Sequence, residues 1–367
     1  MPLFPWLYGR CPLCRGHKFA YLCDKMEKVG IITPRLRTSA LAVLMSCAAA
    51  ATAQEAVDYK PNIHGAIRTR WEMETESGDS RFQVRNARVS LDGRIAQPIE
   101  YFIQADFCDR GTMKILDAWG RLTLAEGFKI QAGQFRMPFG VDPGRAPSNY
   151  IFSNRSYLGK EVCNVRAVGA KLMYSFKDVP LSIEAGAFNP TSISDHETWN
   201  SYMAYSGKVT YKWGNVKLNA GVKTIVPDSV RINLLDGNIS WSAGRWLIEG
   251  EYINKHYTNG AHSTCHAYTI FADYHLPVKA GVFNQLSFQG RFDGMTNHSN
   301  GKRDAEGKLH TTDPARKRIT IGTTLSYIQG PVHADIRVNY EKMFFDNDVK
   351  APQGKGDKIL AELVIRF

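Results

Sequence analysis

Basic side chains outnumber acidic ones in one long stretch of the sequence that has little periodicity. Between residues 138 and 166 the basic residues are Arg145, Arg155, Lys160 and Arg166. Asp142 and Glu161 are the acidic residues of the same stretch. A group of cationic side chains attracts anions and lets them leave again when no single site binds too tightly. The stretch therefore predicts a surface that interacts with small anions, and the alternative is a solvated loop whose charges have no particular role.

Further charged residues occupy alternate positions in segments with a period of two. Successive side chains of a β-strand point to opposite faces, so these charges share one polar face of each strand. Eleven basic residues stand against nine acidic ones, which favours a slight preference for anions over a strict binding site. The basic residues are Arg68, Arg70, Lys129, Lys171, Lys217, Lys223, Arg245, Arg291, Arg318, Arg337 and Arg366. The acidic residues are Glu72, Glu74, Glu184, Glu249, Glu251, Asp273, Asp293, Asp335 and Glu362.

Other motifs give little support to metal binding, catalysis or nucleic-acid binding. The stretch HYTNGAHSTCH holds His256, His262, Cys265 and His266, which could bind zinc or copper if they converged, but a polar loop is the better interpretation. There is no G-x-S-x-G, no H-E-x-x-H and no phosphate-cradling glycine loop. Basic residues do not alternate with aromatic ones in runs that could bind nucleic acid. We expect no enzyme activity, no cofactor and no metal.

The first 53 residues have the features of an export signal with extra residues in front. An apolar run from Ala40 to Ala51 follows basic residues, and Ala51 and Ala53 form a small-x-small cleavage pattern. We predict a signal peptide over 26–53 that starts at Met26, with 1–25 read from a start codon called too early. Lipoprotein processing at Cys47 is the alternative. The mature chain, 54–367, keeps 39 basic and 33 acidic residues, and we assign no role to its three cysteines, Cys108, Cys163 and Cys265.

The mature chain is predicted to consist of about sixteen antiparallel β-strands. Period-two segments such as VHADIRVNY recur along it, and short turn signals such as IQGP separate many of them. Three longer gaps fall at 138–165, 191–202 and 297–315. Alternation of short turns with long loops is typical of β-barrels that span an outer membrane. We therefore expect a single domain over 54–367.

The alternation in the last predicted strand, KILAELVIRF, helps to distinguish a membrane barrel from a soluble sandwich. Its apolar face holds Phe367, Ile365 and Leu363, and its other face is mostly polar. Outward aromatics near strand ends would form the girdles that membrane barrels place at both interfaces. They are Trp71, Tyr174, Trp213, Trp246, Tyr274, Tyr327 and Tyr340. The pattern favours an apolar face toward lipid and a polar face toward a lumen, with a secreted β-sandwich as the alternative.

Four consecutive motifs in residues 81–140 resemble the phosphate-selective porin O and P family. They are RFQVRNARVSLDGRI, YFIQADF, LDAWGRL and GQFRMPFG, and YIFSNRSYL after them resembles the family's Phe-x-x-Arg-Ser segment. The matching residues are Arg85, Arg88, Gly93, Asp106, Asp117, Gly133, Gln134, Phe135, Pro138, Phe139, Gly140, Phe152 and Arg155. Asn86 stands where the family often has a second arginine, which weakens any prediction of an arginine cluster there.

The resemblance implies an all-β transmembrane barrel of sixteen strands, in a homotrimer in the outer membrane of a Gram-negative bacterium. It also implies that the 138–165 loop folds inward as a constriction, with Arg145, Arg155, Lys160 and Arg166 along the anion pathway. The expected function is passive diffusion of small hydrophilic solutes with a weak preference for anions, phosphate among them. The alternative is a non-conducting barrel that serves as a surface scaffold or nutrient-uptake partner. Membrane lipid and the barrel-assembly machinery are the other expected partners, and Phe367 is expected to be the assembly signal.

Overall fold

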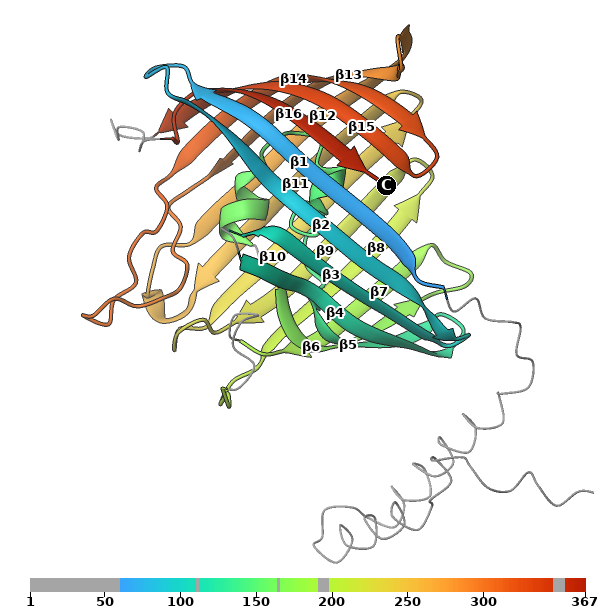
Figure 1. The fold of residues 1–367 in the computed structure, drawn as a ribbon. Helices are drawn as coiled ribbons and strands as arrows, with labels where there is room; N and C mark the ends of the chain where they lie inside the picture. The colour runs from blue at the N-terminus through green and yellow to red at the C-terminus, as the bar shows by residue number, and fades with distance from the viewer. Residues whose placement is uncertain (1–59, 110–111, 164–165, 191–197, 346–353) are drawn as a thin grey trace, which may run out of the picture. The chain divides into compact units, whose positions relative to one another are not determined.

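The computed structural model describes residues 60–109, 112–163, 166–190, 198–345 and 354–367, which form a closed antiparallel barrel (Figure 1). The predicted leader, 1–53, lies outside the described residues. Every strand pairs with its neighbours in the sequence, and β1 pairs with β16 to close the barrel. The strands are β1 (Asn62–Glu74), β2 (Ser80–Ala96), β3 (Ile99–Asp109), β4 (Thr112–Ala125), β5 (Phe128–Arg136), β6 (Arg166–Ser175), β7 (Leu181–Phe188), β8 (Ala204–Trp213), β9 (Val216–Ile225), β10 (Ile232–Ala243), β11 (Trp246–Tyr257), β12 (Cys265–Ala280), β13 (Phe283–Met295), β14 (Arg316–Gln329), β15 (Val332–Phe345) and β16 (Lys358–Arg366).

The strand that closes the barrel has the two faces predicted for it. Leu363 and Phe367 are 43% and 51% exposed on the outer wall, whereas Leu360 and Glu362 on the inner face are 0% and 2% exposed. Closure leaves no unpaired strand edge, which lipid would not tolerate because it cannot hydrogen-bond the backbone. The prediction of a sixteen-stranded antiparallel barrel is confirmed.

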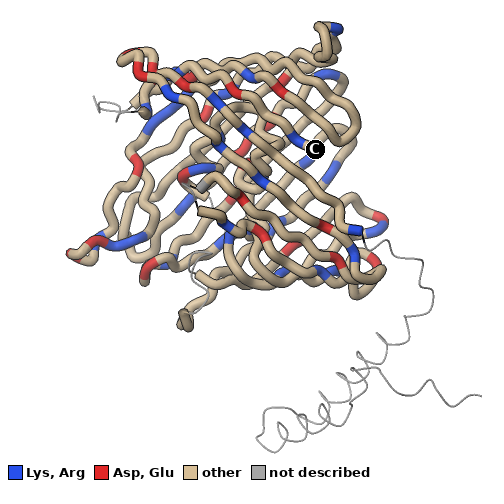
Figure 2. Tube along the Cα trace, viewed as in Figure 1, with Lys and Arg blue, Asp and Glu red and all other residues tan. Residues whose placement is uncertain are grey.

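The wall is apolar outside and charged inside, the reverse of a soluble sandwich. Ile239 and Ile321, on the outer face, are 54% and 57% exposed. Asp293 and Glu341, on the inner face, are fully buried. Acidic and basic positions are interspersed along the strands, as Figure 2 shows. No described helix is long and apolar enough to cross a membrane. The burial pattern therefore requires an apolar surrounding for the outer wall and polar partners within.

The lumen is partly filled by the segment between β5 and β6, which contains two short helical turns, η2 (Pro147–Asn149) and η3 (Leu158–Val162). Leu158 and Val162 pack in one buried cluster with Ile232 of β10 and Ile253 of β11. These wall residues point inward at positions where a water-filled lumen would need polar side chains. An apolar core inside the barrel therefore holds this segment, which we call the inner loop (residues 137–163), against one side of the wall.

Gly65 on β1 is the receiving position for the C-terminal residue. The Gly65 N–H donates to the Phe367 carbonyl at 2.9 Å, and the Phe367 N–H donates to the Gly65 carbonyl at 3.1 Å. A Cβ at Gly65 would overlap the Phe367 ring. A side chain at this position would therefore have to displace the Phe367 ring from the closing seam.

We predict that Gly65→Val weakens closure of the barrel by about 1–3 kcal/mol, as forced overpacking does. The fraction of heat-modifiable folded barrel after refolding into detergent should fall. Gly237→Val on β10 is the matched control, because nothing lies within 4 Å of a Cβ there. Equal yields of the two variants would show that the ring of Phe367 does not require Gly65.

Candidate functional site

The first half of the inner loop is bound by two carboxylates of β11. The backbone N–H groups of Val141 and Asp142 both donate to Glu251 at 2.8 Å. Arg145 donates to both carboxylate oxygens of Glu249, at 2.8 and 2.9 Å. Both glutamates are only 3% exposed. Hydrogen bonds to a charged acceptor are the strong ones, so the start of the loop is fixed against the β11 wall.

The second half of the inner loop is bound by β13 and β14, which lie opposite β5 and β6 in the strand order. Asp293 of β13 accepts from the backbone N–H of Tyr157 at 3.0 Å and from Arg318 of β14 at 2.8 and 3.0 Å. Arg318 also donates to the carbonyl of Arg155 at 2.7 Å and to Glu341 at 3.1 Å. The loop therefore reaches from β5 and β6 to the wall formed by β11, β13 and β14, where buried charges hold both of its halves.

Several basic residues predicted to line the lumen are bound in this anchoring network. Arg68 and Arg337 both donate to Glu362, at 2.5 and 2.9 Å. Arg291 lies 3.2 Å from Asp293. Buried charges of this kind need their partners, since an unpaired one costs several kcal/mol. Arg68 and Arg291 also donate to loop carbonyls, those of Ser153 and Asn154, both at 2.8 Å. The carboxylate partners offset most of the charge of these guanidinium groups, including that of Arg68, which also lines the space that remains.

A cavity of about 770 Å³ remains beside the inner loop, mainly along β2 to β6. Its charged lining is strongly unbalanced, with nine basic residues against two acidic ones. The basic residues are Arg68, Arg85, Arg88, Lys114, Arg136, Arg155, Lys160, Arg166 and Lys255, and the acidic ones are Asp106 and Glu161. A cavity with this lining attracts anions electrostatically.

Three of the four basic residues predicted for the anion pathway line this cavity, and one does not. Arg166 makes a bidentate pair with Asp117, at 2.9 to 3.2 Å. Lys160 is 2.9 Å from Glu161, and its side chain is 51% exposed. Arg155 stacks over the Tyr150 ring at 5.7 Å. Arg145 lies outside the cavity lining in its pair with Glu249, so the structure gives it an anchoring position.

The remaining predicted lining residues are spread over the barrel. Arg70 pairs with Glu72 at 3.0 Å, Lys171 pairs with Glu184 at 2.5 Å, and Lys129 lies 3.6 Å from Glu100. Lys223 donates to the Cys163 thiol at 2.8 Å, and Lys217 is exposed. Arg245 lies in the two-residue turn before β11, which begins at Trp246, so it sits at the barrel rim instead of on the strand face predicted for it.

Two β-bulges bring basic residues into the cavity that period-two analysis missed. Register shifts leave Arg85 of β2 and Leu116 of β4 without cross-strand partners. An extra residue in one strand resets the alternation, so positions three apart share a face. Arg85 and Arg88 of β2 therefore both reach the cavity. In β4, Lys114 and Asp117 share the inner face in the same way, so that Lys114 lines the cavity and Asp117 pairs with Arg166. In the sequence, these two arginines were noticed only because they match the family motif, since alternation alone could not place Arg85 and Arg88 on one face.

The two arginines of β2 that line the cavity differ in how their charge is balanced. Arg88 donates to Asp106 at 2.8 Å, and Asn86 donates to the same carboxylate at 3.0 Å. Arg85 is exposed and has no ion-pair partner among the described residues. Asp106 therefore neutralises one of the two guanidinium groups and leaves the other to act on ions in the cavity.

The histidines and cysteines of the β11–β12 hairpin do not converge. Cys265 is fully buried in the inner cluster, whereas His266 contacts the Tyr252 hydroxyl at 2.6 Å near the outer face. His262 contacts Thr311, at 3.1 Å, in another loop. The described residues of this hairpin thus offer no shared ligand position.

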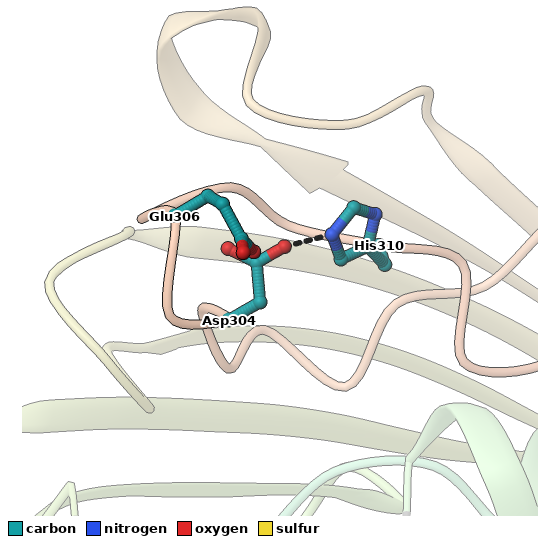
Figure 3. Close-up of side chains that lie close together, drawn as sticks. All are labelled: Asp304, Glu306 and His310. Atoms are coloured by element: carbon teal, nitrogen blue, oxygen red, sulfur yellow. Dashed lines mark ion pairs between the residues drawn. The ribbon is translucent and has the colours of Figure 1, made fainter.

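Asp304, Glu306 and His310 come together in the loop between β13 and β14 (Figure 3). Their ligand atoms all lie within 4.8 Å of one another, and Asp304 pairs with His310. The backbone N–H of Lys308 donates to Asp304 at 2.8 Å and lowers the pKa of that carboxyl. Glu306 and His310 are exposed. The loop's own hydrogen bonds account for this arrangement, and we assign no ion to it.

Two protein-family models match overlapping parts of the chain. Residues 57–216 match the phosphate-selective porin O and P model, and residues 149–288 match the Gram-negative porin model. These matches confirm the resemblance seen in the sequence motifs. No curated protein matches the chain.

Solved structures share the fold at low sequence identity. The anion-selective porin from Comamonas acidovorans has a TM-score of 0.57 at 12% identity, and the match covers 84% of this chain and 98% of that one. The trimer form of OmpT from Vibrio cholerae has 0.56 at 11%, covering 84% and 98%. The outer-membrane channel DcaP of Acinetobacter baumannii has 0.56 at 11%, covering 86% and 100%.

We predict that Asp293→Ala releases the second half of the inner loop. The substitution removes the acceptor of the Tyr157 N–H and leaves Arg291 and Arg318 short of a carboxylate, a loss of about 3–5 kcal/mol for a broken buried pair. Trypsin should then cleave the folded barrel after Arg155. The control is Glu184→Ala, which removes a lumen carboxylate that pairs with Lys171. Resistance of Asp293→Ala to cleavage, equal to that of the control, would contradict the anchoring role.

Proposed function

Because this chain belongs to the porins of the Gram-negative outer membrane, we propose that it is a diffusion pore for small hydrophilic solutes with a weak preference for anions, phosphate among them. The observation that carries the preference is the charge of the cavity beside the inner loop, nine basic residues to two acidic ones. A unit charge acting over 4 Å is worth about 1 kcal/mol in water and a few times that near protein. Such a lining raises the local concentration of anions along the path.

The same geometry supports a weak preference instead of a tight filter. Arg88 and Arg166 share their charge with Asp106 and Asp117 at about hydrogen-bonding distance. Lys160 is paired with Glu161 but remains half exposed. A tight phosphate site needs several donors that converge on one point, whereas the guanidinium groups of the cavity are spread along its wall. Conduction also requires that an ion can leave as easily as it enters.

The alternative function, a non-conducting scaffold or nutrient-uptake partner, is supported by the apolar core inside the barrel. Leu158, Ile232 and Ile253 fill one side of the lumen where a wide pore would hold water. The open cavity on the other side favours the pore. The chain is a member of a family of channels, and we propose that it has no catalytic activity.

Outward Trp and Tyr side chains support a homotrimer. Eleven of them lie on β6 to β15, but β1 to β5 and β16 together present only Trp71 and Tyr101 among the described residues. Such aromatics mark the interface between lipid and water. A sector with few of them is better suited to contact with other copies of the chain. Lipid would cover the remaining wall, and the barrel-assembly machinery would bind the C-terminal strand with Phe367 as its signal.

We predict that the double substitution Arg85→Gln and Lys160→Gln lowers the anion-to-cation permeability ratio by about two- to fivefold, the effect of charges acting over roughly 4–8 Å of water. Reversal potentials in a potassium chloride gradient measure the ratio. The matched control is Lys302→Gln with Lys308→Gln, which removes two exposed charges that do not line the cavity. Equal shifts in both variants would remove the cavity from the ion path.

The trimer face is predicted to be shielded from lipid. Tryptophan introduced at Ile103 of β3 should be quenched little by brominated phospholipid, whereas tryptophan at Ile239 of β10 should be quenched strongly. Both native side chains are about half exposed on the isolated wall, at 46% and 54%, so only assembly distinguishes them. Strong quenching at both positions would place lipid on β3 and contradict this interface.

A further inference from the structure

The loop between β13 and β14 sends one histidine into the basic cavity. His298 is only 2% exposed and lines the cavity with Asn300 of the same loop. The His298 N–H donates to the Asp313 carbonyl at 2.9 Å, and the Thr312 N–H donates to the His298 carbonyl at 2.7 Å. These bonds fix the main chain of His298 beside Asp313, at the edge of the cavity. This position could not be predicted from the sequence, because His298 lies outside any strand and any histidine cluster.

The imidazole is bonded at both nitrogens. Lys255 of β11 lies 2.9 Å from Nε2, and an Asp313 carboxylate oxygen lies 3.3 Å from Nδ1. An ammonium group has only donors, so Nε2 must accept from Lys255, and the single ring proton then sits on Nδ1 and is donated to Asp313. The observed pair of contacts therefore requires a neutral imidazole.

Charged groups from every surrounding element face this chain of bonds. Arg316 at the start of β14 lies 3.2 Å from Asp313 and 3.5 Å from Glu161 of η3. Lys355, just before β16, lies 3.6 Å from Asp313. Lys255 also donates to the carbonyl of Ser299 at 2.9 Å. Asp313 thus also pairs with two cations, Arg316 and Lys355. If the bond to His298 breaks, Lys255 keeps its contact with the loop through the carbonyl of Ser299.

We propose that His298 is a specificity-determining residue whose protonation changes the charge of the pore. In its neutral form it accepts the hydrogen bond from Lys255 and ties the loop to β11. Once protonated, it presents a donor to the Lys255 ammonium, so this bond breaks, and the cavity wall gains a further positive charge. The inference rests on the proposed function of the chain as a pore.

The direction of the pH dependence follows from burial. Burial lowers the pKa of His298 below its ordinary value, because the protein withdraws the ring from water. The hydrogen bond with Asp313 opposes this shift, and Lys255 adds to it. The hydrogen bond from His298 lowers the pKa of Asp313, which therefore stays ionised. An exposed imidazole takes up a proton near pH 6.5. The hydrogen bond from Lys255 to His298 is therefore fully formed above about pH 6.5 and is lost as pH falls through the lower pKa of the buried ring.

Reversal potentials of the full barrel in a potassium chloride gradient, from pH 7.5 down to pH 4.5, test the proposal. The anion-to-cation permeability ratio should rise about twofold on acidification, the factor for a unit charge acting over roughly 8 Å of water. His298→Gln keeps a neutral hydrogen-bonding group and should lose this rise. His310→Gln is the matched control, because His310 belongs to the same loop but does not line the cavity. It should keep the rise.

Asp313→Asn provides a second variant with its own signature. It removes the negative charge beside the ring, so His298 should take up its proton only at a still lower pH, and the rise should move to lower pH. The proposal is overturned if the wild type shows no rise, or if His298→Gln keeps it. A wild type that prefers cations at every pH would instead contradict the proposed anion preference, while the response to His298→Gln would still decide the role of this residue.

Discussion

Asp293, fully buried on β13, accepts from Arg318 on the neighbouring strand and from the backbone N–H of Tyr157, so one carboxylate joins the barrel wall to the loop that crosses its lumen. Backbone N–H and C=O groups of a loop inside a barrel need partners as much as those of the strands do. Charged wall residues supply them, since Glu251 accepts from the Val141 and Asp142 N–H groups and Arg318 donates to the carbonyl of Arg155. The position of the inner loop therefore determines which part of the lumen stays open.

This arrangement divides the charges of the lumen into two groups. Guanidinium groups of β1 and β13 to β15 have carboxylate partners at hydrogen-bonding distance and are nearly fully buried. Those of β2 to β6 surround the cavity, where basic residues outnumber acidic ones. An ion passing through meets a field set by the second group, because a satisfied pair contributes little beyond a short distance. The net charge of the whole lumen is therefore a poor guide to selectivity.

Much of the fold could be predicted from alternation, but the site only in part. The two faces of KILAELVIRF follow from period two, and closure follows from the cost of an open edge in lipid. The bulges at Arg85 and Leu116 could not be predicted, because an extra residue leaves no local trace in the pattern. Nor could the pairing of Arg145 with Glu249, which are 104 positions apart. Positions of charges on a face were predictable, whereas their partners depend on the path of the inner loop.

The most direct measurement of the central claim is the single-channel current of the purified, heat-modifiable wild-type barrel in a planar bilayer under a potassium chloride gradient at neutral pH. The structure predicts discrete ohmic steps and a reversal potential on the anion-selective side, because the open cavity beside the inner loop is lined by an excess of basic residues. A folded barrel that conducts no current would favour the scaffold, and a reversal potential on the cation-selective side would contradict the proposed ion path.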